Sequence, residues 1–360
     1  MRPAVLFLCA CCVLAAPPLT PEQQTLSDHI TENSLRGHVS FLASDALEGR
    51  ATPSPGQEIA AEYIAAQFRR AGLEPAGDGG TYFQTASFQD MSRAAKSSPT
   101  IRARLEAAEQ HPGTIRNVIG LLRGSDAALR DTYVILSAHY DHLGMTNTGA
   151  DRIFNGANDD ASGTASVIEI AAALSALPSH PKRSILFIAF FGEELGLVGS
   201  QYYARHPVVP LERTIADLNL EQVGRTDASN GDMTGTASIT GFDFSDLPER
   251  LQRAGAELGI RVYKDEKGSD PYFKQSDNLP LAEAGVVSHT LCVAFQFPDY
   301  HRVGDEWEKL NYRNMAAVDA VVAVGLVELA SEEAPPEWRK DRPAAKAYVE
   351  AAKKLHTEKP

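Results

Sequence analysis

Short apolar runs alternate along the chain with longer segments in which apolar residues recur at helical spacing. Residues 185–191 (ILFIAFF) form a continuous apolar run, which is typical of a strand covered by other elements on both faces. In residues 162–177 the apolar side chains recur on one helical face, which predicts a helix. The same criteria predict strands at 133–138, 215–220 and 286–294, and helices from Leu35 onward and at 56–71, 197–205, 247–258 and 315–329.

This alternation predicts an α/β fold with a mostly parallel central sheet flanked by helices. The 360 residues show no internal repeat, and a single catalytic domain at 20–330 is the simplest organisation for them. Residues 331–360 are rich in charge and proline, so we expect a charged, solvated C-terminal tail with one short helix near 344–355. Residues 85–113 are polar, and their pattern assigns them to no regular element.

The N-terminal residues have the pattern of a secretory signal. One positive residue, Arg2, precedes an apolar stretch of about a dozen residues, which small residues and two prolines follow. The stretch is shorter than the roughly 20 residues that a membrane-spanning helix needs, so we expect no stable membrane span. We expect residues 1–19 to be a signal peptide without one marked cleavage point, and the protein to be periplasmic or extracellular. Cys11 and Cys12 leave a lipid anchor as an alternative.

Charge and cysteine content argue against a nucleic-acid partner, an internal disulfide and a thiolate metal site. The chain has 34 Lys and Arg residues against 47 Asp and Glu residues, and its net charge is −13. This balance argues against nucleic acid as a partner, because phosphate binding needs clustered cations. Cys9, Cys11 and Cys12 lie in the leader, so the mature domain keeps Cys292 alone, and an internal disulfide or a thiolate metal site is excluded there.

Each predicted strand is followed by residues that can carry chemistry. The strand at 133–138 leads to HYDH (139–142), the strand at 185–191 leads to GEELG, and Glu221 follows the strand at 215–220. The loop NGANDDASG (155–163) leads into a helix, and DYH (299–301) follows the last strand. Because ligands of open α/β sheets bind at the carboxyl ends of the strands, we expect these side chains to meet at one edge.

The residue types in this set indicate a metal centre. Taken singly, paired acids such as Glu193 and Glu194 are usually solvated at a helix start, and Asp159 with Asp160 is usually a helix cap. Together, imidazoles and carboxylates without a thiolate suit an ion such as zinc. Five or six converging ligands exceed the needs of one four-coordinate ion with an open position, whereas a two-metal site with a bridging carboxylate uses them all.

The sequence resembles the co-catalytic dizinc exopeptidase family, which includes bacterial secreted aminopeptidases and glutamate carboxypeptidase. The resemblance rests on SAHYDHLG (137–144), NGANDDASG (155–163), FFGEELGLVGS (190–200), NLEQVGR (219–225) and DYHRVGDEWEKLNY (299–312), and it extends in looser form over 35–330. It implies a zinc peptidase domain at 20–330. Larger relatives carry an inserted lid domain, for which the interval 84–117 is too short here.

The resemblance implies a metal ligand set at specific positions. His139 and Glu221 would hold one Zn²⁺ ion, Glu194 and His301 would hold the other, and Asp159 would bridge the two. The family usually has Asp where this chain has Glu221, which keeps a carboxylate but moves it by one methylene.

Two catalytic roles also follow from the resemblance. Asp141 would orient the imidazole of His139. Glu193 would be the general base, taking a proton from a water shared by the two ions and delivering it to the leaving amine. The family has a cis peptide bond at the step that matches Asp159–Asp160.

These roles imply an exopeptidase, which we expect to be an aminopeptidase that docks the free α-amine of a peptide beside the metals. We expect its specificity pocket to draw on 263–281 and on the loop around Tyr300. Tyr272, Phe273 and Phe297 suggest an apolar pocket, although core positions account for these aromatic residues equally well.

Three alternatives remain at this point. A carboxypeptidase or dipeptidase would need a basic cluster for the substrate carboxylate, for which Arg225, Arg302 and Lys274 are candidates. A glutaminyl cyclase of the same family would use a single zinc ion. A non-catalytic relative would have lost ligands or the base, all of which this chain retains. The sequence does not indicate an oligomeric state.

Overall fold

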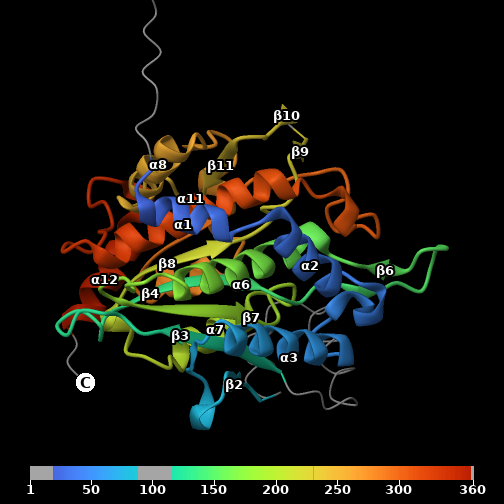
Figure 1. Ribbon diagram of the computed structural model, residues 1–360, viewed down its shortest axis with the longest axis horizontal. Helices are drawn as coiled ribbons and strands as arrows, with labels where there is room; N and C mark the ends of the chain where they lie inside the picture. The colour runs from blue at the N-terminus through green and yellow to red at the C-terminus, as the bar shows by residue number, and fades with distance from the viewer. Residues whose placement is uncertain (1–18, 88–114, 230, 358–360) are drawn as a thin grey trace, which may run out of the picture.

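The computed structural model describes residues 19–87, 115–229 and 231–357. One central sheet runs through the molecule, with helices on both faces (Figure 1). Its nine strands are β1 (Glu74–Pro75), β2 (Phe83–Thr85), β3 (Arg116–Leu122), β4 (Tyr133–His139), β7 (Ser184–Phe190), β8 (Thr214–Leu220), β11 (Thr236–Ile239), β12 (Arg261–Tyr263) and β13 (Val287–Cys292). Two small hairpins lie outside the sheet and pair β5 (Gly144–Met145) with β6 (Ile153–Phe154) and β9 (Asp227–Ala228) with β10 (Gly231–Asp232).

The sheet is parallel in its middle and mixed towards its edges. Its order is β1-β3-β7-β4-β8-β13-β11-β12, and β2 pairs with β3 beside this path. The four central strands β7, β4, β8 and β13 are parallel, whereas β3 is antiparallel to β7 and β11 is antiparallel to β13. The predicted α/β fold with a mostly parallel central sheet is therefore confirmed, and antiparallel pairs with β3 and β11 make the sheet mixed towards its edges.

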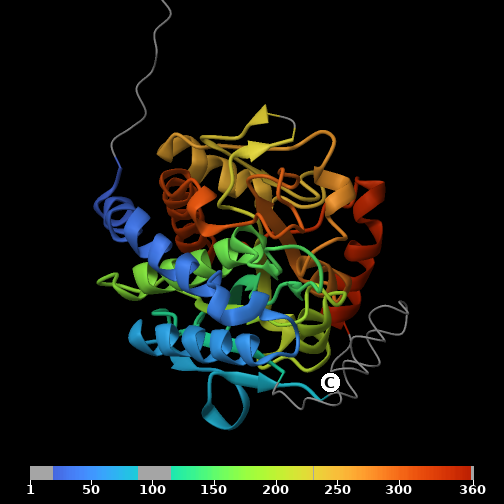
Figure 2. The same cartoon turned by 90° about the vertical axis from the view of Figure 1, so that its right-hand side faces the viewer.

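Helices of the described residues form a layer on each face of the sheet (Figure 2). One layer contains α6 against β4, with α3 against β3 and with α2 and α11 packed on α6. The other layer contains α7, α10 and α12, where α10 packs against β13. The helices are α1 (Pro21–His29), α2 (Glu32–Leu42), α3 (Pro55–Arg70), α6 (Ser162–Ser175), α7 (Val198–Arg205), α8 (Leu247–Leu258), α9 (Ser269–Tyr272), α10 (Asn278–Glu283), α11 (Tyr312–Ser331) and α12 (Lys346–Thr357).

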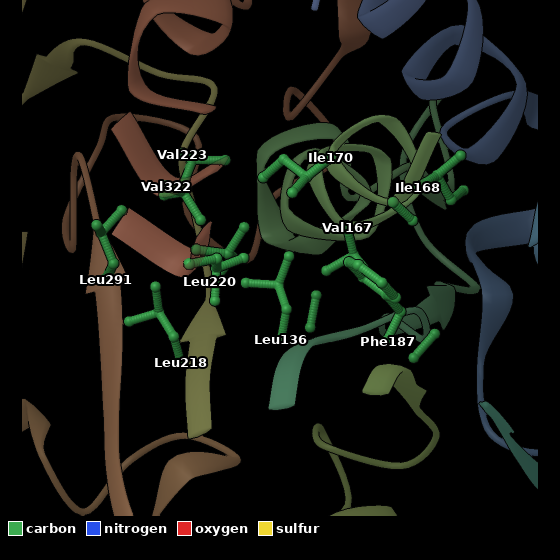
Figure 3. Close-up of a cluster of buried hydrophobic side chains, with 14 of the residues drawn as sticks. Leu136, Val167, Ile168, Ile170, Phe187, Leu218, Leu220, Val223, Leu291 and Val322 are labelled. Carbon is green, nitrogen blue, oxygen red and sulfur yellow. The ribbon is translucent and has the colours of Figure 1, made fainter. Parts of the chain in front are cut away.

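Alternating side chains of the central strands build two cores. Val134 and Leu136 of β4 belong to the larger core under α6, and Figure 3 shows Val167 and Ile170 of that helix turned towards Leu136. Ile135 of the same strand belongs to the smaller core on the opposite face. Burial on both faces explains why the central strands have apolar runs instead of a simple alternation of apolar and polar residues.

Strand β8 departs from that apolar pattern in a way that matters for the site. Ala216, Leu218 and Leu220 face the larger core, while Asp217 and Asn219 point to the opposite face. Asp217 accepts hydrogen bonds there from the hydroxyls of neighbouring strands. A row of polar side chains therefore runs along one face of β8 towards its carboxyl end.

The predicted elements coincide with observed ones to within a few residues. The predicted strands at 133–138, 185–191, 215–220 and 286–294 are β4, β7, β8 and β13, and every predicted helix is present. Within α3, Ile64 is fully buried, whereas Ile59 is 48% exposed.

The C-terminal segment is packed on the domain and is not a solvated tail. Trp338 forms a β-bridge with Ser245 and is 5% exposed, and Tyr348 of α12 packs against the rings of Trp338 and Phe273. Apolar residues in an otherwise charged segment supply this contact. The expected short helix exists as α12, beginning two residues later than predicted.

Helix α11 has the length and hydropathy of a membrane span among the described helices, but its place in the fold explains them. Of its most apolar window, 72% is buried inside the protein, against α1, α2, α6 and α8. It is therefore a core helix of the domain.

Several predictions fall wholly or partly outside the described residues. These are the signal peptide at 1–19, of which only Leu19 is described, the leader cysteines, and most of the polar segment 85–113. Cys292 is described, and it is a buried free thiol at the end of β13.

Candidate active site

The predicted site residues lie at the carboxyl ends of neighbouring parallel strands. His139 is the last residue of β4, and Glu221 directly follows β8. Glu193 and Glu194 follow β7 after a turn at Gly192, whose φ of 68° favours glycine. Because β7, β4 and β8 are adjacent and parallel, their ends bring these side chains together, as expected from the sequence.

The first group of candidate ligands is formed by His139, Asp159 and Glu221. Nε2 of His139 lies 3.3 Å from Oδ1 of Asp159, and a carboxylate oxygen of Glu221 lies within 4.8 Å of both. The longer side chain of Glu221 therefore still reaches the group in which the family usually has Asp.

The second group shares Asp159 and adds Glu194 and two histidines. Nε2 of His301 lies 3.0 Å from Oδ2 of Asp159 and 3.3 Å from Oε1 of Glu194. Nδ1 of His142 lies 2.8 Å from the same Oε1 and 3.9 Å from the same Oδ2. The sequence prediction contains His301 but not His142, although His142 stands in the quoted HYDH motif and its position there is the signal that was available.

The polar atoms of both groups fit a pair of cations. Nε2 of His139, both ring nitrogens of His142, Oδ2 of Asp159 and Oε1 of Glu194 are buried and have no hydrogen-bond partner. Unpartnered buried polar atoms are costly, and native structures rarely keep them without a ligand or water. Imidazole and carboxylate donors without a thiolate are ligands that Zn²⁺ accepts.

Hydrogen bonds to two buried carboxylates hold the loop that carries Asp159. Asp305 is fully buried, and its carboxylate accepts hydrogen bonds from the backbone N–H of Asn158 (3.0 Å) and of Asp159 (3.1 Å). Asp160 turns the other way and accepts from the N–H groups of Gly163 and Gln222 (3.0 and 3.1 Å). The sequence prediction did not include Asp305, although it stands in the quoted motif DYHRVGDEWEKLNY, and its position there is the signal that was available.

The peptide bond between Asp159 and Asp160 is cis, as the resemblance implied.

Glu193 is the one acid of the pair that belongs to neither ligand group. Its backbone N–H donates to Oδ1 of Asp141 at 3.1 Å, so Asp141 holds the main chain of Glu193 in place. Burial raises the pKa of the Glu193 carboxyl well above its ordinary value; nearby His139 opposes this rise, and Glu221 and Glu194 add to it. A carboxylate with a raised pKa is suited to accept a proton near neutral pH.

Asp141 also lies on the far side of the His139 ring. Oδ1 of Asp141 is 3.6 Å from Nδ1 of His139, and the backbone carbonyl of Asp141 is 3.2 Å from the same nitrogen. The hydrogen bond at this ring nitrogen is thus to the carbonyl oxygen, and orientation of His139 by the carboxylate of Asp141 stays a prediction.

Arg50 lies behind the site and was not predicted from the sequence. It is fully buried, and its guanidinium donates to the carbonyl oxygens of Tyr140 (2.9 Å), Asn155 (2.7 Å) and Gly156 (3.0 Å), and also to that of Leu42. Burial lowers the pKa of Arg50 to about 10, and the acids of the site oppose this shift. Arg50 therefore ties the HYDH loop to the loop that leads to Asp159.

A cavity of about 500 Å³ opens onto the ligand groups. Its far wall is formed by Tyr272, which stacks on Phe295 with ring centroids 4.5 Å apart, and by Thr240 and Thr290. Tyr300 also lines it, as expected from the sequence.

Two of the three aromatic residues expected in the specificity pocket are not there. Phe273 is fully buried against Phe244 and Tyr348 in the core. Phe297 is 4% exposed and packs on Tyr300. Both therefore take the core positions that the sequence also allowed, and Tyr272 alone of the three lines the cavity.

The candidate cations for a substrate carboxylate are scattered. Arg225 is paired with Asp227 at 2.6 Å and with Asp299 at 2.9 Å, so its charge is already compensated. Lys274 lines the cavity, while Arg302 is exposed on the loop beside His301. The described lining contains four carboxylates, of Asp159, Glu193, Glu194 and Glu221, and one lysine.

Comparison with known proteins places this geometry in a family. The model of peptidase family M28 matches residues 117–325. The chain is 28% identical over 242 residues to "Aminopeptidase YwaD" of Bacillus subtilis; the match covers 65% of this chain and 49% of that protein, so the chain spans about half the length of this curated relative.

Two solved structures share the fold. The LapA aminopeptidase of Legionella pneumophila superposes with a TM-score of 0.63 at 20% identity, covering 89% of this chain and 78% of that one. The glutaminyl cyclase of Porphyromonas gingivalis superposes with a TM-score of 0.62 at 19% identity, covering 83% of this chain and 98% of that one. At such identities the likeness establishes the architecture, and the family assignment rests on the family model. That model matches more than half of the chain, so the protein belongs to peptidase family M28.

Proposed function

We propose that this protein is a zinc-dependent aminopeptidase that hydrolyses N-terminal residues from peptides. The observation that carries the proposal is the pair of ligand groups sharing Asp159, with the free carboxyl of Glu193 beside them at the end of an open cavity. Bound there, two Zn²⁺ ions would supply Lewis acidity, which lowers the pKa of water from 15.7 to about 7 and polarises a carbonyl.

The residues of the chain then have separate tasks. Glu193 accepts a proton on its carboxylate and returns it to the amine that leaves, which its raised pKa supports. Asp141 fixes the main chain of Glu193, and the contact with His139 keeps that imidazole aimed at Asp159. The base is therefore held by hydrogen bonding before a substrate arrives.

The described cavity wall offers no cluster of free cations for a substrate carboxylate. Lys274 is its one ammonium group, and Arg225 is paired with Asp227 and Asp299. Two bound Zn²⁺ ions would balance the charge of the four wall carboxylates, so the selection depends on this lack of cations. That lack supports an aminopeptidase over a carboxypeptidase.

A panel of aminoacyl-nitroanilides, each with a free and an N-acetylated amine, tests this proposal. We expect hydrolysis of the free substrates, loss of it with EDTA and recovery with Zn²⁺. Equal cleavage of the acetylated substrates would contradict an aminopeptidase, and cleavage confined to C-terminally free dipeptides would favour the dipeptidase alternative. Conversion of N-terminal glutamine to pyroglutamate without peptide hydrolysis would identify a glutaminyl cyclase. If the zinc-loaded protein acted on none of these substrates, it would be a non-catalytic relative.

We further propose that the protein is exported. The support is the charge and hydropathy pattern of residues 1–19, and Cys11 and Cys12 keep lipid attachment as an alternative. Mass spectrometry of the protein purified from its own cells would show whether the N-terminus is cleaved or acylated.

A further inference from the structure

His142 stands within the second ligand group, although the resemblance gives it no role. Its ring is fully enclosed, with a side-chain exposure of 0%. Nδ1 lies 2.8 Å from Oε1 of Glu194 and 3.9 Å from Oδ2 of Asp159. The same two oxygens face Nε2 of His301 at 3.3 and 3.0 Å. Both imidazoles thus approach the same two carboxylate oxygens, and Nδ1 of His142 forms a candidate metal group with them.

Hydrogen bonding does not explain this arrangement. Neither ring nitrogen of His142 has a hydrogen-bond partner, in spite of the short approach to Glu194, and Oε1 of Glu194 and Oδ2 of Asp159 are without one too. A buried imidazole with two unsatisfied nitrogens beside unsatisfied carboxylate oxygens is unfavourable. A cation held between Nδ1 and the two oxygens would satisfy three of these atoms at once.

The surroundings fix the ring in this position. Gly156 has a φ of 60°, and a Cβ atom there would come within 2.5 Å of Cγ and Cδ2 of His142. The edge of the His142 ring also meets the His301 ring, with centroids 5.8 Å apart and planes at 68°. The glycine in the NGANDD loop therefore makes room for this imidazole, and little space is left for it to rotate away.

We propose that His142 is a ligand, through Nδ1, of the metal ion held by Asp159, Glu194 and His301. This inference rests on the metal centre of the proposed function and adds to it an asymmetry between the two ions. With His142 and His301 both bound, the ion beside His142 would have four protein ligands, whereas the ion beside His139 and Glu221 would have three and keep an open position. A site closed by protein side chains is characteristic of a retained structural ion, and an open site is characteristic of a catalytic one.

His142 also differs from His301 in how securely it is held. The side chain of His301 is 37% exposed, and the residue lies on a loop with a φ of 55°. His142 is enclosed and lies three residues beyond the end of strand β4. Of the two imidazoles, the closed site therefore has one that is shielded from solvent and one that is partly exposed.

Metal binding, measured apart from activity, tests the proposal. The protein is stripped of metal and titrated with Co²⁺, following the visible absorption of the bound ion, for the wild type, His142→Phe and His142→Asn. The phenylalanine variant preserves the volume of the ring. The asparagine variant provides a second test if the phenylalanine variant does not fold. The matched control is His38→Phe, which removes a buried histidine that contacts Glu169 at 3.2 Å and belongs to neither ligand group.

We expect the wild type to bind two equivalents of Co²⁺ with unequal affinity. In both His142 variants the tighter equivalent should weaken by at least about 100-fold, because even partners of a ligand are worth 10–100-fold in metal affinity. The His38→Phe control should bind as the wild type does. Two equivalents with unchanged affinities in the His142 variants would overturn the proposal and leave the proposed function standing.

A measurement on the unaltered protein does not depend on the folding of any variant. In the proton spectrum of the Co²⁺-loaded wild type, each coordinated imidazole contributes one strongly shifted, exchangeable N–H signal. We expect three such signals, from His139, His142 and His301. Two signals would exclude His142 as a ligand, and a wild type that binds no Co²⁺ would remove the metal centre itself and this inference with it.

Discussion

Buried acids in two regions of the molecule differ in their hydrogen bonding. Asp217, in the middle of strand β8, accepts hydrogen bonds from the hydroxyls of Ser137 (2.9 Å) and Ser288 (2.5 Å). Asp159 and Glu194, at the carboxyl end of the sheet, each keep a buried oxygen without a hydrogen-bond partner. Both groups are removed from water, so burial alone does not mark a functional site.

The difference teaches where function resides in this fold. A buried acid whose hydrogen bonds are complete contributes to the structure, and its substitution should change stability. A cluster whose buried polar atoms have no hydrogen-bond partner within the chain is suited to bind an ion or another ligand. Substitution of its residues should therefore change binding or turnover. The following predictions test this separation.

The largest effect is expected at the base. Glu193→Gln removes the proton acceptor and keeps the shape, so kcat should fall about 1,000-fold, within the range of general-base contributions. The metal content by mass spectrometry and the melting temperature should stay those of the wild type. Glu350→Gln on the exposed face of α12 is the matched control, and a variant at 193 with near wild-type turnover would refute this role.

Removal of metal should destabilise the unpartnered cluster. We expect EDTA to lower the melting temperature and Zn²⁺ to restore it, because an ion that binds the folded state at 1,000 times its Kd adds about 4 kcal/mol to the free energy of unfolding. Scanning calorimetry measures the change, with added Ca²⁺ as a control for ionic strength. An unchanged melting temperature would show that the cluster needs no ion.

Arg50 combines the two situations. Each nitrogen of its guanidinium donates a hydrogen bond, and the carbonyl oxygens that accept them include those of loops that carry site residues. Arg50→Met leaves buried carbonyl oxygens of two ligand loops without donors, which should lower the free energy of unfolding by about 3 kcal/mol. Urea denaturation measures this, and the exposed Arg253→Met serves as control with a change below about 0.5 kcal/mol. A loss as small as that of the control would mean that Arg50 does not hold the loops together.

The smallest effect on turnover is expected at Asp217, which should cause only a pH dependence of stability. Burial raises the pKa of this carboxyl to about 7, although Ser288 and Ser137 oppose the rise. The folded chain therefore holds a proton that the unfolded chain releases near pH 4, so the free energy of unfolding falls as the pH rises from about 4 to 7. The total fall from this group is at most about 4 kcal/mol.

Asp217→Asn should remove that slope while leaving turnover unchanged. Urea titrations at several pH values measure it, with the exposed Asp341→Asn as control. If the variant keeps the wild-type slope, the carboxyl of Asp217 is not the group that titrates.

The central strands could be predicted from the sequence because their burial on both faces requires a continuous run of apolar residues. The continuous apolar run of β7 reflects burial on both faces, and a run of this length and composition is uncommon outside a covered strand. The apolar run NVIGLL in β3 also predicts a strand, but our assignment did not include it, because it follows a polar segment without regular pattern. The short strands β11 and β12 depend on partners distant in sequence and have too few residues to show a period.

The ligand positions predicted from motifs do converge, since order along the chain and a parallel sheet suffice to bring strand ends together. What the sequence could not supply was orientation. His142 enters the site because Gly156, in another loop, leaves room for its ring. Phe273 and Phe297 have the composition expected of a pocket, and only tertiary packing places them in the core.

The polar row on β8 has a consequence for how this protein can change. Asp217 and Asn219 alternate with apolar residues on the strand, and Glu221 continues their spacing into the metal site. Because neighbouring residues of a strand point to opposite faces, gain or loss of one residue before Asp217 would move this acid into the larger aliphatic core and turn the leucines towards Ser137 and Ser288. The strand can therefore tolerate exchanges of individual side chains far better than any change in its length.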